Sequence, residues 1–189
     1  MRYFLILLVL TKFTYSQSQP LDSCYKKTWN EGNHRLIWDD FKYTSESTSP
    51  FGAAGKVNIY YKNEFKEDSF IVRVMAYFDQ CASWVKVKDS FLLIHEQGHF
   101  DLTEIYARTL RAKLQELKFS TISQALISVQ KACDTILVNL NKEQDIYDQE
   151  TNHSSNFSRQ LWWSQNIKYK LDCLSKYSND RVYLIRKRS

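Results

Sequence analysis

One stretch decides the fold class: residues 89–118, which read DSFLLIHEQGHFDLTEIYARTLRAKLQELK. It contains no proline and a single glycine, and its apolar residues recur three and four positions apart. This period is typical of an amphipathic helix with one buried face. We therefore predict one long helix from Asp89 to Lys118. Its inner stripe holds His95, His99, Leu102, Tyr106, Leu110 and Leu114.

The residues before this helix have the pattern of strands. Residues 55–62 and 69–79 are rich in β-branched and aromatic side chains, and in the second segment the side chains alternate with a period of two. We expect these two segments to pair as a hairpin, and we expect a shorter strand from Arg35 to Phe41. One face of the second segment holds Phe70, Val72, Val74, Ala76 and Phe78, and the other holds Ile71, Arg73, Met75 and Tyr77.

Two further helical stripes follow the long helix. The later one runs from Phe157 to Tyr177. Because the strands come first and the helices afterwards, the predicted class is α+β, with a small N-terminal antiparallel sheet packed on the long helix and on two further helices. The earlier stripe holds Ile122, Leu126, Val129, Cys133, Ile136 and Leu140.

The composition is that of one globular domain. Of 189 residues, 43% are hydrophobic and 15% aromatic, with only 4 Gly and 2 Pro, which excludes disordered and collagen-like chains. The net charge is +5, but three of the positive charges lie in residues 186–189. A short basic end is usually a solvated terminus, so we expect no nucleic-acid partner.

The first sixteen residues have the composition of a signal peptide. Arg2 supplies a basic start, residues 4–10 form an apolar core, and Thr14 and Ser16 place small side chains before a cleavage point after Ser16. The alternative is a buried N-terminal strand. The apolar run is shorter than the roughly 20 residues that a membrane-spanning helix needs, so we expect no stable membrane insertion. We predict a secreted or periplasmic protein whose single mature domain spans residues 17–189.

Export would place the cysteines in an oxidising compartment. The chain has four of them, which is an even number, and none forms a Cys-x-x-Cys pair. We therefore expect two disulfides rather than a zinc knuckle or a redox site, with three pairings open. The disulfide candidates are Cys24, Cys81, Cys133 and Cys173.

The chemistry is concentrated in residues 95–99, which read HEQGH. Residues four apart on a helix are separated by only about 40° around its axis, so the imidazoles of His95 and His99 can point at one ion. Glu96 can reach the fourth coordination position of a zinc ion, where a water molecule would sit, and can act there as general base. The spacing therefore predicts a Zn²⁺ site.

The alternative interpretation of this motif is structural: both histidines could be core residues bonded to backbone carbonyls. Two features weigh against it. Half of the four histidines in the chain lie within this one motif. A carboxylate also stands between them, and its burial would be costly without a cation nearby.

Zinc needs a third protein ligand, which this helix does not supply. At 100° per residue, Asp101 lies about 220° and Glu104 about 160° from the mean direction of the two histidines. We expect Asp101 in a supporting contact, or as an alternative ligand. The extended metzincin motif H-E-x-x-H-x-x-G-x-x-H, which supplies a third histidine after the helix turn, is excluded. Leu102 and Ile105 stand where this motif requires glycine and histidine.

The third ligand is expected in the polar segment 143–153. A second helix that runs back after a tight turn regains the level of His99 near Asn139, at about 1.5 Å per residue, so the residues that follow lie near the site. We favour His153 as the third metal ligand, because imidazole suits zinc. Asp148 is the alternative ligand, or else an acceptor that fixes an imidazole tautomer.

Four blocks of the sequence carry a resemblance to a known family. They are residues 36–41 (LIWDDF), 83–85 (SWV), 93–101 (LIHEQGHFD) with 105–108 (IYAR), and 147–153 (YDQETNH) with Gln160 and Trp163. These blocks resemble the bacterial proteins grouped as domain of unknown function 922, which are described as predicted secreted zinc-dependent proteases. One departure is Ser154, where that family often has glycine. The resemblance implies that the site includes Tyr147, Asp148, Thr151 and His153.

The function predicted from these features is that of a secreted, zincin-like zinc metallopeptidase acting on a protein or peptide substrate. Glu96 would take the proton of the water, and Tyr147 is expected as a catalytic donor to the developing oxyanion, or else as a buried structural residue. The strand near residues 82–87 could present an edge to an extended peptide. The alternatives are a non-catalytic, zinc-stabilised extracellular binding protein and a hydrolase of a cell-wall amide.

Overall fold

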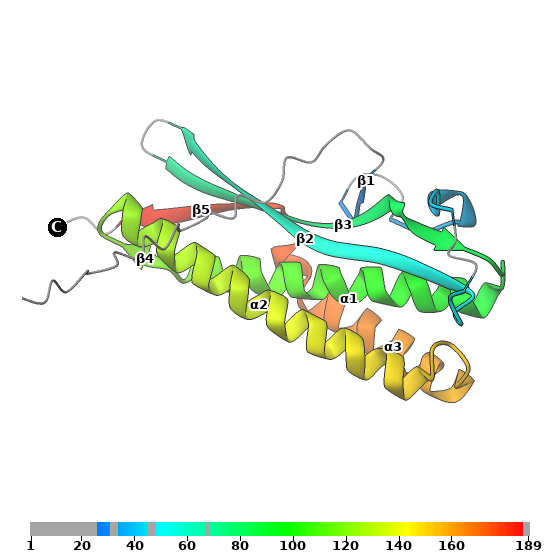
Figure 1. Ribbon diagram of the computed structural model, residues 1–189. Coiled ribbons are helices and arrows are strands. Elements are labelled where there is room, and N and C mark those ends of the chain that lie inside the picture. The colour runs from blue at the N-terminus through cyan, green and yellow to red at the C-terminus, as the bar shows by residue number, and fades with distance from the viewer. Residues whose placement is uncertain (1–25, 31–33, 45–47, 67–68, 187–189) are drawn as a thin grey trace, which may run out of the picture.

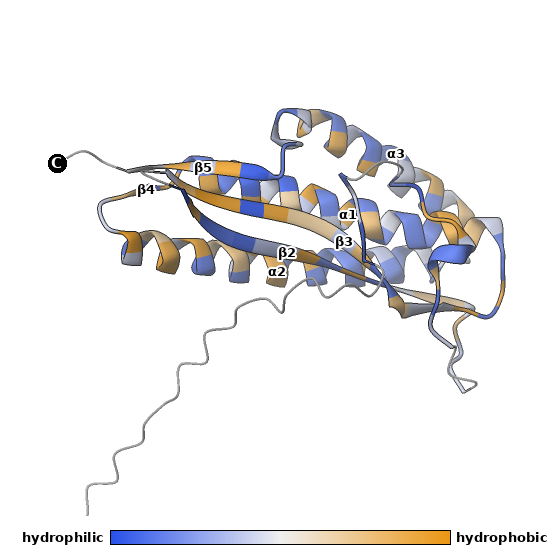
Figure 2. Cartoon of the chain, turned by 90° about the horizontal axis from the view of Figure 1, so that it is seen from above, coloured by the Kyte–Doolittle hydropathy of each residue, from blue (hydrophilic) through white to orange (hydrophobic). Residues whose placement is uncertain are grey.

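The structure is a computed structural model that describes residues 26–30, 34–44, 48–66 and 69–186 (Figure 1). The predicted signal peptide and Cys24 lie outside the described residues. Two layers are visible in Figure 1, a sheet above and helices below, which confirms the α+β class. Seen from above, α1 lies between α2 and α3 (Figure 2). The helices are α1 (Ser90–Gln115), α2 (Ile122–Thr151) and α3 (Phe157–Cys173), with short 3-10 turns at Trp38–Asp40 and Ser175–Tyr177.

The sheet is built around one long central strand. The strands are β1 (Lys26–Thr28), β2 (Ala53–Lys66), β3 (Ser69–Val85), β4 (Lys118–Phe119) and β5 (Arg181–Arg186). One side of β3 pairs with β2, and the other pairs with β1 and β5, all antiparallel. β4 joins β5 in parallel. The predicted hairpin is confirmed, with Lys66 paired with Ser69 beside its turn.

The face of β3 that was predicted from its alternation forms the core. Phe70, Val72 and Phe78 are almost completely buried, together with the intervening residues of the same face. They belong to one hydrophobic cluster with the inner residues of α1 and α2. The sheet therefore packs its apolar face on these two helices, and this packing fixes α1 beneath β2 and β3.

The helix α1 begins where its sequence provides a cap. The Asp89 side chain accepts hydrogen bonds from the backbone N–H groups of Phe91 and Leu92, which satisfies donors that the first turn leaves open. The helix ends at Gln115, three residues before the predicted end at Lys118. It is therefore continuous through the whole HEQGH motif.

The helix α2 is longer than its apolar stripe. The stripe ends at Leu140, but the helix continues to Thr151. In the added turns the polar residues Gln144, Asp148 and Thr151 contact the two histidines of α1, and Tyr147 is the buried aromatic residue among them. The hydrophobic period therefore ends before the helix does.

Between α2 and α3 the chain turns through three consecutive left-handed residues. Asn152, His153 and Ser154 have φ values of 46°, 47° and 74°. Backbone bonds hold the turn, since His153 N donates to the carbonyl of Asp148 at 3.0 Å. The Asn156 side chain then caps α3 by accepting from Arg159 N.

The structure differs from the sequence prediction at residues 35–41 and at β5, and it adds the short unpredicted strands β1 and β4. The expected strand at residues 35–41 is wrong: a 3-10 turn spans Trp38–Asp40, because the Asp40 carboxylate accepts from Ile37 N at 3.0 Å and so closes a local turn. The strand β5 was not predicted, and it corrects the simple order of strands followed by helices. Its alternation is short, with only Val182 and Leu184 shown to be buried.

A buried arginine joins α1 to the sheet beside β5. β5 pairs with residues 70–73 of β3, and the next carbonyl, that of Val74, accepts from Arg111 Nε and Nη2 at 3.0 and 2.8 Å. Arg111 Nη1 donates to the Tyr177 carbonyl and to Glu104, both at 2.9 Å. The side chains of Arg111 and Glu104 are fully buried. Every charge in this group is therefore paired.

The prediction that all four cysteines are oxidised is corrected. Cys81 is disulfide-bonded, but Cys133 and Cys173 are free thiols. Cys133 lies on the inner face of α2 within the core, where burial raises the pKa of its thiol to about 12, whereas Cys173 is exposed at the end of α3. The two side chains lie in different environments, one apolar and closed and the other open to solvent.

Within the described part of the chain, no helix is both long enough and apolar enough to cross a membrane.

Candidate metal site

Three side chains from α1 and α2 converge at one point. His95 Nε2 lies 3.0 Å from Asp148 Oδ1, His99 Nε2 lies 2.9 Å from the same oxygen, and the two Nε2 atoms are 3.1 Å apart. Among the described residues, these three form the one group of potential metal ligands close enough to share an ion. The motif spacing on α1 brings the two histidines together as predicted, and α2 supplies the carboxylate.

The three donor atoms fit a zinc ion. A triangle with sides of about 3 Å leaves room for a point about 2 Å from each corner, which is the usual distance from zinc to imidazole nitrogen or carboxylate oxygen. The His95 side chain is 4% exposed, that of His99 13% and that of Asp148 30%. The donor set is therefore largely buried, and its carboxylate side is open to solvent.

The charges within this group are strongly coupled. Burial by itself would raise the pKa of Asp148, but hydrogen bonds with His95 and His99 hold it well below its usual range. Burial would likewise lower the pKa of His99, but the hydrogen bond with Asp148 and the nearby charge of Glu96 raise it. The surroundings of Asp148 therefore favour its ionised form.

His153, which the sequence favoured as third ligand, lies at the rim of the site. Its Nδ1 is 3.7 Å from Asp148 Oδ1, its side chain is 48% exposed, and its ring packs against Phe51 at 4.8 Å. It does not belong to the convergent group. The left-handed turn places its ring outside Asp148, so the third member of the convergent group is the carboxylate that was predicted as the alternative ligand.

Tyr147 lies beneath the two histidines and is fully buried. Its ring stacks on His95 with centroids 4.7 Å apart and meets His99 edge-on at 4.9 Å. The Tyr147 hydroxyl donates to the backbone carbonyl of His95 at 3.1 Å and accepts from Gln160 Nε2 at 2.6 Å. Both of these bonds support the helix, so the geometry agrees with the structural alternative rather than with an oxyanion donor.

Gly98 makes this close approach possible. A Cβ atom at residue 98 would lie 2.2 Å from the Tyr147 hydroxyl oxygen. The glycine inside the motif therefore has a packing reason, because it lets the Tyr147 ring reach the backbone of α1 between the two histidines.

Glu96 lies in the same cleft as the three donors, beside the start of β2. Its Oε2 accepts a hydrogen bond from Gly55 N at 2.8 Å, and the side chain is almost completely buried. A Cβ atom on Gly55 would lie 2.7 Å from that oxygen, so the absence of a side chain lets strand and carboxylate meet. The cleft has a volume of about 230 Å³. It is lined by residues 51–55, Leu92, His95, Glu96, His99, Asp148 and His153.

The strand edge beside the cleft differs from the one expected. Residues 82–87 were predicted to present a free edge, but Val85 and Trp84 pair with Ala53 and Ala54 of β2, and Tyr43 bridges Trp84. That expectation is wrong, because β3 is a central strand. The strand that borders the cleft is β2, and among the described residues no strand pairs with its outer edge.

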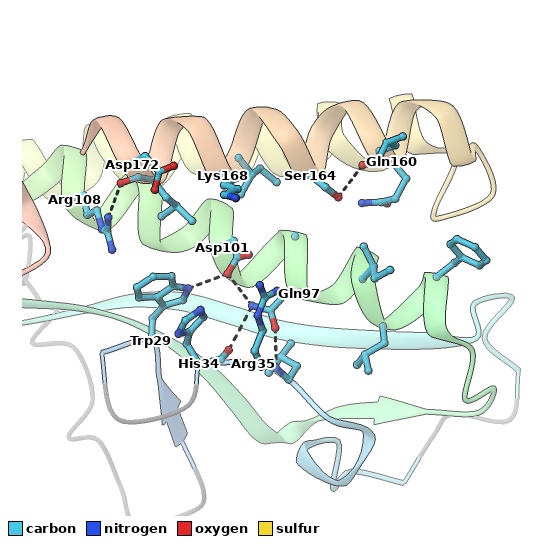
Figure 3. Close-up of a pocket in the computed structure, with 18 of the residues that line it drawn as sticks. Trp29, His34, Arg35, Gln97, Asp101, Arg108, Gln160, Ser164, Lys168 and Asp172 are labelled. Atoms are coloured by element: carbon cyan, nitrogen blue, oxygen red, sulfur yellow. Dashed lines mark hydrogen bonds between the residues drawn. The ribbon is translucent and has the colours of Figure 1, made fainter. Parts of the chain in front are cut away.

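Asp101 supports the fold away from the donors. Its Oδ1 accepts from Trp29 Nε1 at 2.9 Å and from Gln97 Nε2 at 2.7 Å, and the Gln97 Oε1 accepts from Leu36 N at 2.7 Å. Burial raises the pKa of Asp101, and these donors partly offset the rise. Asp101 and Gln97 thus attach the N-terminal segment to α1, as Figure 3 shows.

A second and larger cavity lies along α1. It has a volume of about 700 Å³ and shares no residue with the cleft of the three donors. It is lined by α1, α3, Trp29 and residues 34–36. In Figure 3, Lys168, Ser164 and Gln160 line it from α3. The two hollows are therefore separated by α1 itself.

Two glutamines that the sequence analysis did not place in the site contact the imidazoles. Gln144 Oε1 lies 2.5 Å from His99 Nδ1, and Gln160 Oε1 lies 3.2 Å from His95 Nδ1. Gln160 appeared in the family resemblance without a role, and Gln144 carried no signal. The four-residue spacing of Gln144 and Asp148 could have indicated a shared helical face.

Comparison with known families supports one part of the prediction. Residues 75–154 match the family model of DUF922, described as a bacterial protein of unknown function. This range includes α1, α2, the three donors, Glu96 and the left-handed turn, so the predicted resemblance is confirmed there. No curated protein and no solved structure matches the chain significantly. The protease and zincin assignments stay predictions.

Proposed function

We propose that this chain is a secreted zinc metallopeptidase. One observation carries the proposal: His95, His99 and Asp148 converge in a cleft that also contains the buried carboxylate of Glu96. Two imidazoles and one carboxylate are a donor set of catalytic zinc sites, which keep one position open. Zinc supplies a Lewis acid that lowers the pKa of water and polarises a carbonyl oxygen. Export rests on residues 1–16, as predicted from the sequence.

Glu96 is the proton acceptor in the proposed reaction. The bond from Gly55 N orients its carboxylate and engages one oxygen, which leaves the other to face a water molecule in the cleft. Glu96 takes a proton from the attacking water and returns it to the nitrogen that leaves when the amide bond breaks. His95, His99 and Asp148 hold the metal and take no part in this proton transfer.

The outer edge of β2 supports a peptide as substrate. Residues 51–54 line the cleft immediately before Gly55, so the backbone of the strand and the Glu96 carboxylate border the same space. An extended peptide can add to a strand edge through main-chain hydrogen bonds. Such a peptide would place a carbonyl next to the donors without requiring a particular side chain.

The test separates metal binding from catalysis. Glu96→Gln keeps an oxygen that can accept from Gly55 N, so we expect zinc content equal to that of the parent by elemental analysis. We expect hydrolysis of a mixed peptide library, read by mass spectrometry, to fall by about 10²- to 10⁴-fold. Glu116→Gln, at the exposed end of α1, is the matched control and should keep the parental rate.

Three results would replace this proposal. A parent protein that takes up no zinc contradicts the metal site. Glu96→Gln protein that cleaves at the parental rate contradicts the proton role and favours a zinc-stabilised binding protein. Cleavage of cell-wall amides without cleavage of any peptide in the library would favour the other alternative, a hydrolase of cell-wall amides.

A further inference from the structure

We infer that Gln144 and Gln160 are positioning residues that hold His99 and His95 in the one imidazole tautomer that presents Nε2 to a metal ion. The inference rests on the proposed metal site, but it does not depend on the reaction. It concerns residues from α2 and α3 that the metal-binding motif on α1 does not contain.

Gln144 holds His99 at two points. Its Nε2 donates to the His99 backbone carbonyl at 3.1 Å and to Thr103 Oγ1 at 3.2 Å. These bonds fix the direction of the amide, so its oxygen faces the His99 ring at 2.5 Å from Nδ1. An amide oxygen only accepts, and Nδ1 must therefore carry the hydrogen.

Gln160 holds His95 in the same way, with Tyr147 as an intermediate. Its Nε2 donates to the Tyr147 hydroxyl, and that hydroxyl donates to the His95 carbonyl. The Gln160 oxygen therefore faces His95 Nδ1, at 3.2 Å. Gln160 is almost completely buried, and Figure 3 shows it extending from α3 on the cavity side of α1.

The two arrangements have one consequence for metal binding. Neutral imidazole carries its hydrogen on either nitrogen, and only the other nitrogen has a lone pair to offer. With both Nδ1–H groups bonded to glutamine oxygens, Nε2 is the nitrogen that each ring offers to the ion, and the ion replaces the hydrogen that Nε2 shares with Asp148 Oδ1 when no metal is bound. The protein thus orders both rings before the ion arrives, which is the role that hydrogen-bond partners of metal ligands play.

The decisive variants remove the acceptor and keep the side-chain volume. For Gln144→Leu and Gln160→Leu we expect a loss of about 10- to 100-fold in zinc affinity, measured by competition with a chromophoric chelator. Gln144→Glu retains an acceptor and should keep an affinity at or above that of the parent. The matched controls are Gln149→Leu on α2 and Gln165→Leu on α3, both exposed, which should leave affinity unchanged.

Spectra of the imidazoles provide a readout that a general loss of stability would not produce. In zinc-loaded protein with ¹⁵N-labelled histidine, we expect a protected Nδ1–H signal for both His95 and His99, with Nε2 bound to zinc. Gln144→Leu should expose only the His99 signal to exchange with water, and Gln160→Leu only that of His95. Each variant thus keeps one histidine as its internal reference.

The outcomes distinguish this inference from the proposed function. Parental affinity together with parental spectra in Gln144→Leu and Gln160→Leu would overturn it, as would Nδ1 bound to zinc in the parent. If Glu96→Gln stays active while both glutamine variants lose affinity, the peptidase proposal fails and the positioning role stands. A parent that binds no zinc refutes both.

Discussion

Gly98 is the residue whose replacement tests the support beneath the site. We expect Gly98→Ala to destabilise the fold by about 1–3 kcal/mol, because the new methyl group would lie 2.2 Å from the Tyr147 hydroxyl oxygen and the buried ring must move. Gly52→Ala is the control. Its methyl group would lie 2.9 Å from the end of the flexible Leu92 side chain, which can rotate away. Urea unfolding of both variants measures the difference, and equal stabilities would show that Tyr147 is not held against α1.

The third ligand is decided by comparing Asp148→Ala with His153→Ala. Asp148 converges with both imidazoles and His153 lies outside them, so we expect Asp148→Ala to lose zinc at micromolar concentration. His153→Ala should retain zinc with an affinity within about tenfold of the parent. Equilibrium dialysis followed by elemental analysis measures both. Retention of zinc by Asp148→Ala and loss by His153→Ala would return the assignment to the histidine.

The sequence indicated the part of the site that is local. The spacing of His95 and His99 is a property of one helix, so the pair was predictable together with Glu96 beside it. The choice between Asp148 and His153 depended on where α2 ends and how the chain turns afterwards. Three left-handed residues in succession are not expected from Asn-His-Ser, so the position of the His153 ring could not be read from its neighbours.

At the scale of elements, the turn between α2 and α3 carries strain that one substitution should relieve. Ser154 has φ 74°, where glycine has no steric penalty, so we expect Ser154→Gly to stabilise the protein by about 1 kcal/mol. For a chain of this size that corresponds to a rise of about 2–4 °C in melting temperature. Ser155→Gly, whose residue lacks a positive φ, should lower the melting temperature or leave it unchanged. A lower melting temperature for Ser154→Gly would contradict the strain.

The elements with a continuous apolar pattern were predictable, and the others were not. The hairpin β2–β3 and the helix α1 have long periodic runs, and their predicted and observed ranges largely agree. The extension of α2 beyond Leu140 was hidden because polar residues that contact the imidazoles, such as Gln144 and Asp148, share its inner face with Tyr147. The strand β5 is short, and its identity depends on pairing with β3 from the far end of the sequence.

At the scale of the whole molecule, the ion should act as a ligand that stabilises the fold. A ligand that binds only the folded state adds about 4 kcal/mol when its free concentration is a thousand times its dissociation constant. We therefore expect a chelator to lower the melting temperature of zinc-loaded protein by roughly 8–16 °C, at about 2–4 °C per kcal/mol. Asp148→Ala should melt at one temperature with and without the chelator. If the chelator leaves the melting temperature of the zinc-loaded parent unchanged, the prediction that zinc stabilises the fold is wrong.

The position of β5 also fixes when a newly synthesised chain can finish folding. The hairpin, α1 and α2 are complete once Thr151 has been made, but the strand that covers residues 70–73 of β3 begins only at Arg181. Until then Phe70 and Val72 lie on an open strand edge, and until Tyr177 has been made Arg111 lacks the carbonyl that accepts from its Nη1. Open apolar edges pair with other chains, so we expect a chain that ends before Arg181 to aggregate more readily than the full chain.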